Sequence, residues 1–394
     1  MKSIAASWLL LPLALGLFSA CDVQEETVET AYVFPILPEP SYKFSRNGYS
    51  NVDVLECGFL KQTLDYIYSG FLREASISTP TDHQNVLQRY KEGEFGVQPA
   101  AEVALSPRQS AHRDVVGQDL LNLIEASAKI SGYPLESPYP HRNRPAQMGQ
   151  SGFVGHDIGD ANKFFIDEQG LAPAEVFRFY VMGAIYLDKI LGEHLDDRHF
   201  INPRLLREHQ NVQLVRGRNY TQLEHHLDLA YGYYKHWQGL AHAEGLPILK
   251  DSDHKIFIAL VQARTLLQYY RYDEVLKQIA IVREELSKVV PARAMNLLVG
   301  VNTIANIEER PEHAFDFLSQ AIGLIRCLPF TLRPDGKPYF TYEEAQQLVA
   351  DLLQGKGLWE SQRLLGDEQQ TGSLRNIASR VGRPFNISLQ DIQR

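Results

Sequence analysis

Helical periodicity constrains the fold of this chain more than any other feature, because strand signals are few. Val54–Leu72 is the first amphipathic segment, and further helices are expected at 106–130, 173–195, 221–243, 252–269, 271–288, 291–307, 311–327 and 342–354. Ser106 is expected to cap its helix, with Pro107 in the first turn. The pattern predicts an all-α bundle, either single or made of two bundle-like halves.

The expected domain organisation follows from these helices and the segments between them. We assign residues 43–247 to an N-terminal helical half and residues 248–372 to a C-terminal half, with a boundary near 245–252. Residues 373–394 are expected to form a weakly ordered tail. The longest irregular stretch, 132–163, is of a length that is usually functional or disordered in a compact domain.

The N-terminus has the three-part form of a secretory signal peptide over residues 1–20. Lys2 precedes an apolar stretch from residue 4 to 18, and Phe18-Ser19-Ala20-Cys21 resembles the bacterial lipobox. The apolar stretch falls short of the roughly 20 residues of a membrane-spanning helix. We therefore expect cleavage before Cys21 and lipidation of its sulfur. The alternative is an ordinary signal peptide in which Cys21 is incidental.

Residues 21–42 are expected to be a flexible tether, because acidic and polar residues lead into the proline-rich PILPEP. Asp22 favours retention at the inner membrane, by the rule known for enteric bacteria. Removal of Lys2 with the signal changes the formal net charge from -9 to -10. This acidic balance argues against nucleic-acid binding and against a body that lies flat on anionic lipid.

Candidate ligating residues gather in two segments. On the helix at 221–243, His225 lies three residues before Asp228, so an imidazole and a carboxylate come side by side, with Glu224 adjacent. They could bind a divalent metal or form a structural His–Asp hydrogen bond. In the loop GHDIGD, His156 and Asp160 could add ligands, and a solvated loop is the alternative.

Other polar clusters carry less chemistry. We interpret Glu193-His194 with Asp196-Asp197 as surface charge at a helix end. Cys57 and Cys327 could pair in an oxidising periplasm or stay as two buried thiols. The sequence contains no HExxH helix, GxSxG elbow, phosphate loop or dinucleotide fingerprint.

Several segments in the same order resemble a family of bacterial lipoproteins related to the imelysins. They are FIDEQGL with VMGAIYLDKIL (165–191), EHHLDLAYGYY (224–234), residues 255–264, and FDFLSQAIGLIRCL (315–328). The resemblance implies a secreted, lipid-anchored protein with an all-helical fold of two bundle-like halves. It also implies a metal site at a GxHxxE motif, to which His225 and Asp228 correspond as HxxD, with Leu223 in place of glycine.

Three functions are compatible with these features. The first is a lipid-anchored, periplasm-facing binding protein for iron or another divalent transition metal, working with an envelope uptake complex. The second is an imelysin-type metallopeptidase with Glu224 as general base. The third is a structural or partner-binding envelope lipoprotein. The sequence favours a binding protein over an enzyme, since no familiar catalytic geometry supports hydrolysis.

Overall fold

The computed structural model of the chain describes residues 41–73, 82–94, 96–131, 145–155, 164–242 and 245–392. The expected signal peptide, Cys21 and the candidate ligands His156 and Asp160 lie outside the described residues. From Ser41 onward the contacts group the chain into one compact unit. The division into two halves near 245–252 stays a prediction.

The described elements are predominantly helical, which confirms the all-α prediction. In the first part they are β1 (Ser45–Arg46), β2 (Tyr49–Ser50), α1 (Leu55–Ile67), η1 (Tyr68–Arg73), α2 (His83–Glu92), η2 (Pro99–Glu102), η3 (Ser110–His112), α3 (Arg113–Ile130), β3 (Gly152–Val154), β4 (Phe164–Ile166), α4 (Pro173–Val181), η4 (Met182–His194), α5 (Asp197–Phe200), α6 (Pro203–Gln210) and α7 (Gln222–Ala241). The two strand pairs, β1–β2 and β3–β4, are short and antiparallel.

The later elements are also helical. They are η5 (Pro247–Leu249), α8 (Ser252–Gln268), α9 (Tyr272–Val299), α10 (Val301–Glu309), η6 (Pro311–Ala314), α11 (Phe315–Cys327), η7 (Leu328–Phe330), α12 (Tyr342–Leu353), η8 (Gly357–Trp359), α13 (Ser361–Leu364), α14 (Leu374–Gly382), η9 (Arg383–Phe385) and α15 (Leu389–Ile392). None of the helices in the described residues has the length and apolarity needed to cross a membrane.

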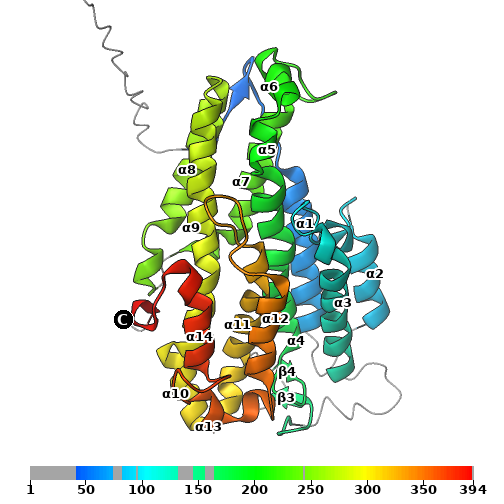
Figure 1. Cartoon of the computed structure of the whole chain (residues 1–394). Coiled ribbons are helices and arrows are strands. Elements are labelled where there is room, and N and C mark those ends of the chain that lie inside the picture. Colours follow the sequence, from blue (N-terminus) through cyan, green and yellow to red (C-terminus); the bar gives the residue numbers. More distant parts are fainter. Residues whose placement is uncertain are drawn as a thin grey trace, which may run out of the picture. The chain divides into compact units, whose positions relative to one another are not determined.

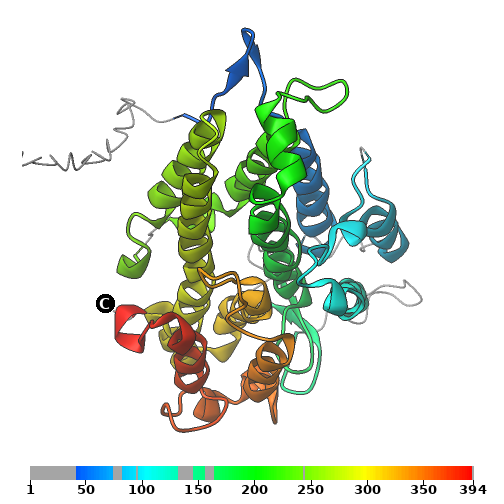
Figure 2. The same cartoon turned by 45° about the horizontal axis from the view of Figure 1, so that its top comes forward.

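The core forms where α4 and its continuation η4 pack among α3, α7 and α11. Helix α11 in turn contacts α9, which runs against α8, as Figures 1 and 2 show. Packing is close where glycines face backbone: a Cβ on Gly323 would lie 2.6 Å from the Phe179 Cβ, and one on Gly183 would lie 2.8 Å from the Cys327 Cα. Glycine is therefore needed at both helix contacts.

Segment η4 is a π-helical continuation of α4 and is almost entirely buried. Its wider turns are closed by bonds from residue i to i−5, as in the 2.9 Å contact from the Leu195 amide to the Ile190 carbonyl. Both Lys189 and His194 lie on this segment. Irregular turns of this kind are frequent at functional sites.

Several sequence expectations need correction. Ser106 does not cap a helix: it is buried, and its amide donates to Asp188 at 2.8 Å, while α3 begins only at Arg113. The helices expected at 271–288 and 291–307 are instead the continuous α9, with Pro291 inside it, followed by α10. A proline has a φ compatible with a helix, and burial of Pro291 among apolar neighbours offsets its missing hydrogen bond.

The C-terminal segment also differs from expectation. Residues 374–382, expected to be weakly ordered, form α14, which packs against α9 through Leu374, Ile377 and Val381. Ser373 caps this helix by accepting from the Asn376 amide at 3.1 Å. The apolar residues of this short stretch recur at helical spacing. That spacing is sufficient for a docked helix because α9 covers its apolar face.

Candidate functional site

Helix α7 carries most of the candidate residues, and a capping box fixes its start. The Thr221 hydroxyl accepts from the Glu224 amide, and the Glu224 carboxylate accepts from the Thr221 amide at 2.8 Å. His209 Nδ1 lies 2.7 Å from the Thr221 hydroxyl and holds the cap against α6. This cap determines the rotation of the first turns of α7 and therefore which neighbours His225, His226 and Asp228 meet.

The carboxylates of α7 face arginines. Asp228 accepts from Arg264 Nε at 3.0 Å and from the Tyr42 hydroxyl at 2.9 Å. Glu224 binds Arg46 at 3.0 Å and lies 3.1 Å from Arg264 Nη1. Arg264 is fully buried on α8, and the two carboxylates balance the charges of Arg264 and Arg46. Buried charges of this kind are tolerated only when they are paired.

Burial and pairing act differently on the two carboxyls. Burial raises the pKa of Asp228 to about 6, although Arg264 and Tyr42 oppose the shift. Burial also disfavours ionisation of Glu224, but the nearby Arg264, the Thr221 amide and Arg46 outweigh it and lower its pKa. The side chains of Glu224 and Asp228 are thus engaged in a network that fixes helix α7 against α8 and the N-terminal segment.

His225 turns away from this network. Its ring stacks on Tyr220 with centroids 4.4 Å apart, and its buried Nδ1 has no hydrogen-bond partner among the described residues. The predicted side-by-side pair of His225 and Asp228 is therefore divided between two environments. His225 borders a pocket with His226, whereas Asp228 contacts Arg264 and Tyr42.

The cavity beside His225 is a pocket of about 420 Å³, which we call the histidine pocket. Its polar lining consists of Glu56, Glu102, Lys189, Glu193, His194, Gln222, His225, His226 and Tyr233. His194 Nδ1 and His226 Nδ1 lie 3.4 Å apart, and the His226 ring stacks on His199 at 3.9 Å. The pocket therefore brings together imidazoles from η4 and α7, and His199 of α5 stacks on His226 from outside the lining.

The histidines of this pocket are neutral. Burial, followed by the neighbouring His226 and Lys189, holds the pKa of His194 well below its usual value. Burial with His199 and His225 lowers the pKa of His226 to about 3, and burial also lowers that of His225. The Nε2 atoms of His194 and His226 are buried without a hydrogen-bond partner among the described residues. A neutral imidazole with a free nitrogen is the form that binds metal.

The remaining polar groups make the pocket acidic. Lys189 Nζ lies 2.6 Å from Glu102 and 3.4 Å from Glu193, and the Tyr233 hydroxyl donates to Glu56 at 2.9 Å. Three carboxylates against one ammonium leave a net charge of −2 on the lining while the imidazoles are neutral. The lining is electrostatically suited to a divalent cation.

The metal fit is partial. In the described residues no three His, Cys, Asp or Glu side chains are already arranged around a common metal position. The spacing of 3.4 Å between His194 Nδ1 and His226 Nδ1 does match one edge of a tetrahedral site. That edge is about 3.3–3.4 Å when metal–nitrogen bonds are about 2.0–2.1 Å. Two ligands are thus spaced for a metal, and a third needs a side-chain rotation.

The interpretation of Glu193-His194 as surface charge is wrong for His194, which is 3% exposed, and for the buried Asp196. The apolar run ILGEHL was a usable signal, because His194 lies between buried leucines. His226 adjoins His225 in sequence, but no local pattern relates it to His194, 32 residues earlier. Cys57 and Cys327 are both free and buried, in agreement with the thiol alternative.

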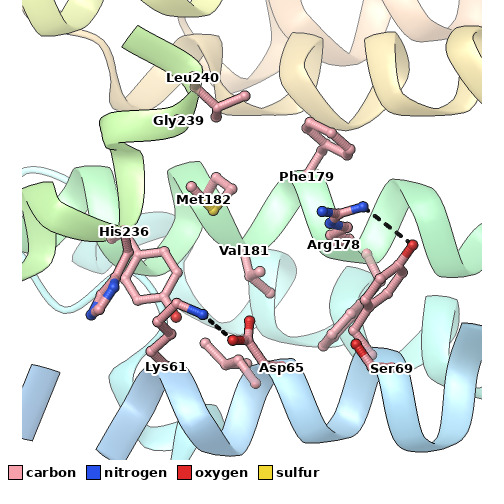
Figure 3. A pocket seen from close by; sticks show the side chains of 14 residues that line it. Lys61, Asp65, Ser69, Arg178, Phe179, Val181, Met182, His236, Gly239 and Leu240 are labelled. Carbon is pink, nitrogen blue, oxygen red and sulfur yellow. Dashed lines mark hydrogen bonds and ion pairs between the residues drawn. The ribbon is translucent and has the colours of Figure 1, made fainter. Parts of the chain in front are cut away.

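A second pocket of about 460 Å³ lies between α1, the α4–η4 helix and the end of α7 (Figure 3). Phe177, Phe179 and Met182 give it apolar walls. At its rim Lys61 pairs with Asp65, and Arg178 lies over the Tyr68 ring with 4.8 Å from its Cζ to the ring centroid. Because these charges are internally paired, the histidine pocket is the stronger candidate site.

These features define an all-α protein whose compact helical unit contains a histidine-lined pocket. The chain belongs to the family described as "Domain of unknown function (DUF4856)", whose sequence model matches residues 39–388. No curated protein and no solved structure matches it. The resemblance to imelysins stays a prediction.

Proposed function

We propose that this chain is an exported, lipid-anchored protein facing the periplasm that binds a divalent transition metal in the histidine pocket. One observation carries the metal proposal: three neutral histidines, His194, His225 and His226, line one acidic pocket, and each has a buried ring nitrogen without a partner among the described residues. Leaving such atoms unpaired costs about 1–3 kcal/mol each. Ligation by a metal at these same nitrogens would remove that cost, which requires the His194 and His226 rings to turn from the arrangement in which their Nδ1 atoms face each other.

The donor set indicates the class of metal. Imidazole suits zinc, copper, iron and nickel, whereas magnesium and calcium prefer oxygen ligands. Glu193 is the nearest carboxylate in sequence to His194, and His225 is the adjacent imidazole on α7. Either could supply the third ligand. Two imidazoles with a carboxylate suit ferrous iron or zinc. Transfer of the bound metal to an uptake complex in the membrane accounts for the lipid anchor of such a carrier.

Binding is better supported than hydrolysis. Glu224, the expected general base of a peptidase, is buried and paired with Arg46 and Arg264. Its lowered pKa also makes it a weaker base. Asp228 packs helices through Arg264 and Tyr42 and not through the expected hydrogen bond to His225, and these contacts do not involve the histidine pocket. A structural role for α7 and a metal site on its other side are compatible.

Metal titration of the full chain tests the proposal. Purified protein stripped with EDTA is titrated with Fe²⁺ under anaerobic conditions and with Zn²⁺, Cu²⁺ and Ni²⁺, with calorimetry and thermal unfolding as readouts. We expect one ion per chain, a raised melting temperature, and at least a tenfold loss of affinity in His194→Ala and His226→Ala. The matched control is His242→Ala, since His242 is exposed and lies outside the pocket.

The outcomes separate the possibilities. Wild-type protein that binds none of these ions contradicts the proposal. Equal metal affinity in the wild type and both pocket variants would show that the metal binds outside the histidine pocket, which also contradicts the proposal. Chelator-sensitive cleavage of an unfolded protein substrate, abolished by Glu224→Gln, would favour the peptidase instead.

A further inference from the structure

Three segments far apart in sequence meet at one end of the helical unit. They are the β1–β2 hairpin region (41–52), the loop from α6 to α7 (210–220) and the turn from α8 to α9 (268–272), and we call their joint surface the end face (Figures 1 and 2). The Asn219 side chain donates to the carbonyls of Arg46 and Tyr49, each at 3.3 Å. The Tyr270 ring packs on His209 at 5.4 Å, which joins the turn to α6.

The end face exposes large apolar side chains. Tyr49 at the hairpin tip is 77% exposed and Tyr269 in the α8–α9 turn is 57% exposed. Further exposed members of the same three segments are Tyr270, Val212, Leu214 and Val215. Tyrosines mixed with aliphatic residues are typical of surfaces at the membrane–water interface, where an aromatic ring has one apolar and one wet side.

The charged residues within the three segments are all basic, and Asp53, Asp273 and Glu274 follow directly after them. The three segments contain five basic residues and no Asp or Glu, in a chain of net charge -9. The basic residues are Lys43, Arg46, Arg216, Arg218 and Arg271. Arg218 is paired with Asp53 at 3.1 Å, Arg46 with Glu224 and Arg271 with Glu274, while Lys43 and Arg216 are exposed. A basic end on an acidic body favours end-on contact with anionic lipid and disfavours contact along the sides.

The short sequence distance between Cys21 and the first described residue supplies the proximity. The described chain starts at Ser41, immediately before the hairpin, and about twenty residues separate it from Cys21. A flexible segment of that length has an end-to-end distance of about 25 Å. A lipid on Cys21 would therefore keep this end near the bilayer, at an effective concentration at which weak contacts are populated.

We propose that the end face docks on the anionic headgroup region of the bilayer, with Tyr49, the 210–220 loop and the 268–272 turn at the interface. The proposal rests on the proposed anchor at Cys21 for proximity, and it is independent of metal binding. The apolar side chains enter the interfacial layer, and Lys43 and Arg216 contact lipid phosphates. Docking orients the helical unit with α9 directed away from the membrane.

Tryptophan fluorescence provides a direct test. Tyr49→Trp is prepared in the full chain and reconstituted in vesicles of phosphatidylethanolamine and phosphatidylglycerol, with or without brominated acyl chains. The matched control is Val301→Trp, because Val301 has the same 77% exposure and follows the 28-residue α9. At 1.5 Å per residue, α9 separates it from the end face by about 40 Å.

We expect vesicles to blue-shift the new tryptophan at position 49 and brominated lipid to quench it. The tryptophan at position 301 should show neither effect, each relative to the tryptophans of the parent chain. Equal quenching at both positions, or none at position 49, overturns the proposal. Absence of quenching together with a dimer in light scattering that Tyr49→Ser dissociates would assign the end face to a second copy of the chain.

A charge test uses the unlipidated full chain, Cys21→Ser, and needs no anchor. We expect Arg216→Gln to lower its partition into phosphatidylglycerol vesicles about fivefold, the loss for one basic residue near an anionic surface. The exposed Arg375→Gln on α14 is the control and should cause no change. Equal partition of all three proteins contradicts docking. Mass spectrometry of Cys21 and metal titration report separately on the anchor and the metal site.

Discussion

Replacement of His226 by asparagine should change how stability depends on pH. In the folded chain the pKa of His226 is lowered to about 3, mainly because the ring is buried, whereas an unfolded histidine has a pKa near 6.5. The unfolded state therefore takes up a proton on acidification that the folded state does not. The stability contributed by the neutral ring is complete above about pH 6.5 and is lost as pH falls below it.

The magnitude between pH 7 and pH 5 is about 2 kcal/mol for one such histidine. Any folded pKa below about 4 gives nearly the same loss at pH 5, so the expectation does not depend on the size of the shift. His194, with its pKa also well below the usual value, adds a similar loss.

Two buried carboxyls act in the opposite direction. Burial raises the pKa of Asp188 and of Asp228 to about 6, so the folded state takes up protons at pH 5 that the unfolded state does not bind. Each carboxyl regains about 1.4 kcal/mol between pH 7 and pH 5. The two effects partly cancel in the wild type, and its pH profile alone would therefore be uninformative.

The comparison between variants isolates the histidine. Urea unfolding in EDTA at pH 7 and pH 5 is measured for the wild type, His226→Asn and the exposed control His242→Asn. The asparagine amide retains a polar atom near the position of Nδ1 but cannot titrate. We expect the stability change between the two pH values to be about 2 kcal/mol less unfavourable in His226→Asn than in the other two proteins. Identical changes in all three would show that the folded His226 titrates normally and would refute a neutral histidine pocket.

Three further outcomes are expected. Gly323→Ala should lower the free energy of unfolding in a urea titration by about 1–3 kcal/mol, because its Cβ would lie 2.6 Å from a side chain of α4. Gly117 has open space around it, so Gly117→Ala should raise the free energy of unfolding by up to about 1 kcal/mol in the same assay. Asp228→Ala should lower the free energy of unfolding by about 3 kcal/mol, the lower end for a broken buried pair, because Arg264 keeps a second carboxylate. In a double-mutant cycle, Asp228→Leu combined with Arg264→Met should lower the free energy of unfolding by less than the sum of the two single variants. The two buried thiols, whose pKa values are raised by burial, should react with a thiol reagent only after unfolding, and prompt reaction in the native protein would contradict their burial.

Local sequence patterns predicted where the helices lie better than they predicted which residues the helices contact. The helix expected at 221–243 is α7 at Gln222–Ala241, because Thr221 and Glu224 form a capping box readable in sequence. The partners of Asp228 could not be predicted in this way. Tyr42 lies 186 residues before it and Arg264 lies 36 residues after it, and only tertiary packing brings these side chains together.

The same limit applies to the candidate site. Helical spacing correctly put His225 and Asp228 near each other along α7, but the rotation of the helix sends them to different environments. His194 joins His226 because the π-helical η4 shifts the register of its last turns, and such a shift has no simple sequence signature. Burial of Ser106 likewise depends on a carboxylate 82 residues away.

The attachment of the N-terminal segment to α7 has a mechanical consequence. Tyr42 and Arg46, near the start of the described residues, bind Asp228 and Glu224 on the first turns of the helix that also carries His225. A pulling force applied through the preceding segment would therefore load α7 directly and would have to break several buried contacts together before reaching the rest of the bundle. The helix that borders the histidine pocket is therefore also the helix that such a force would load first.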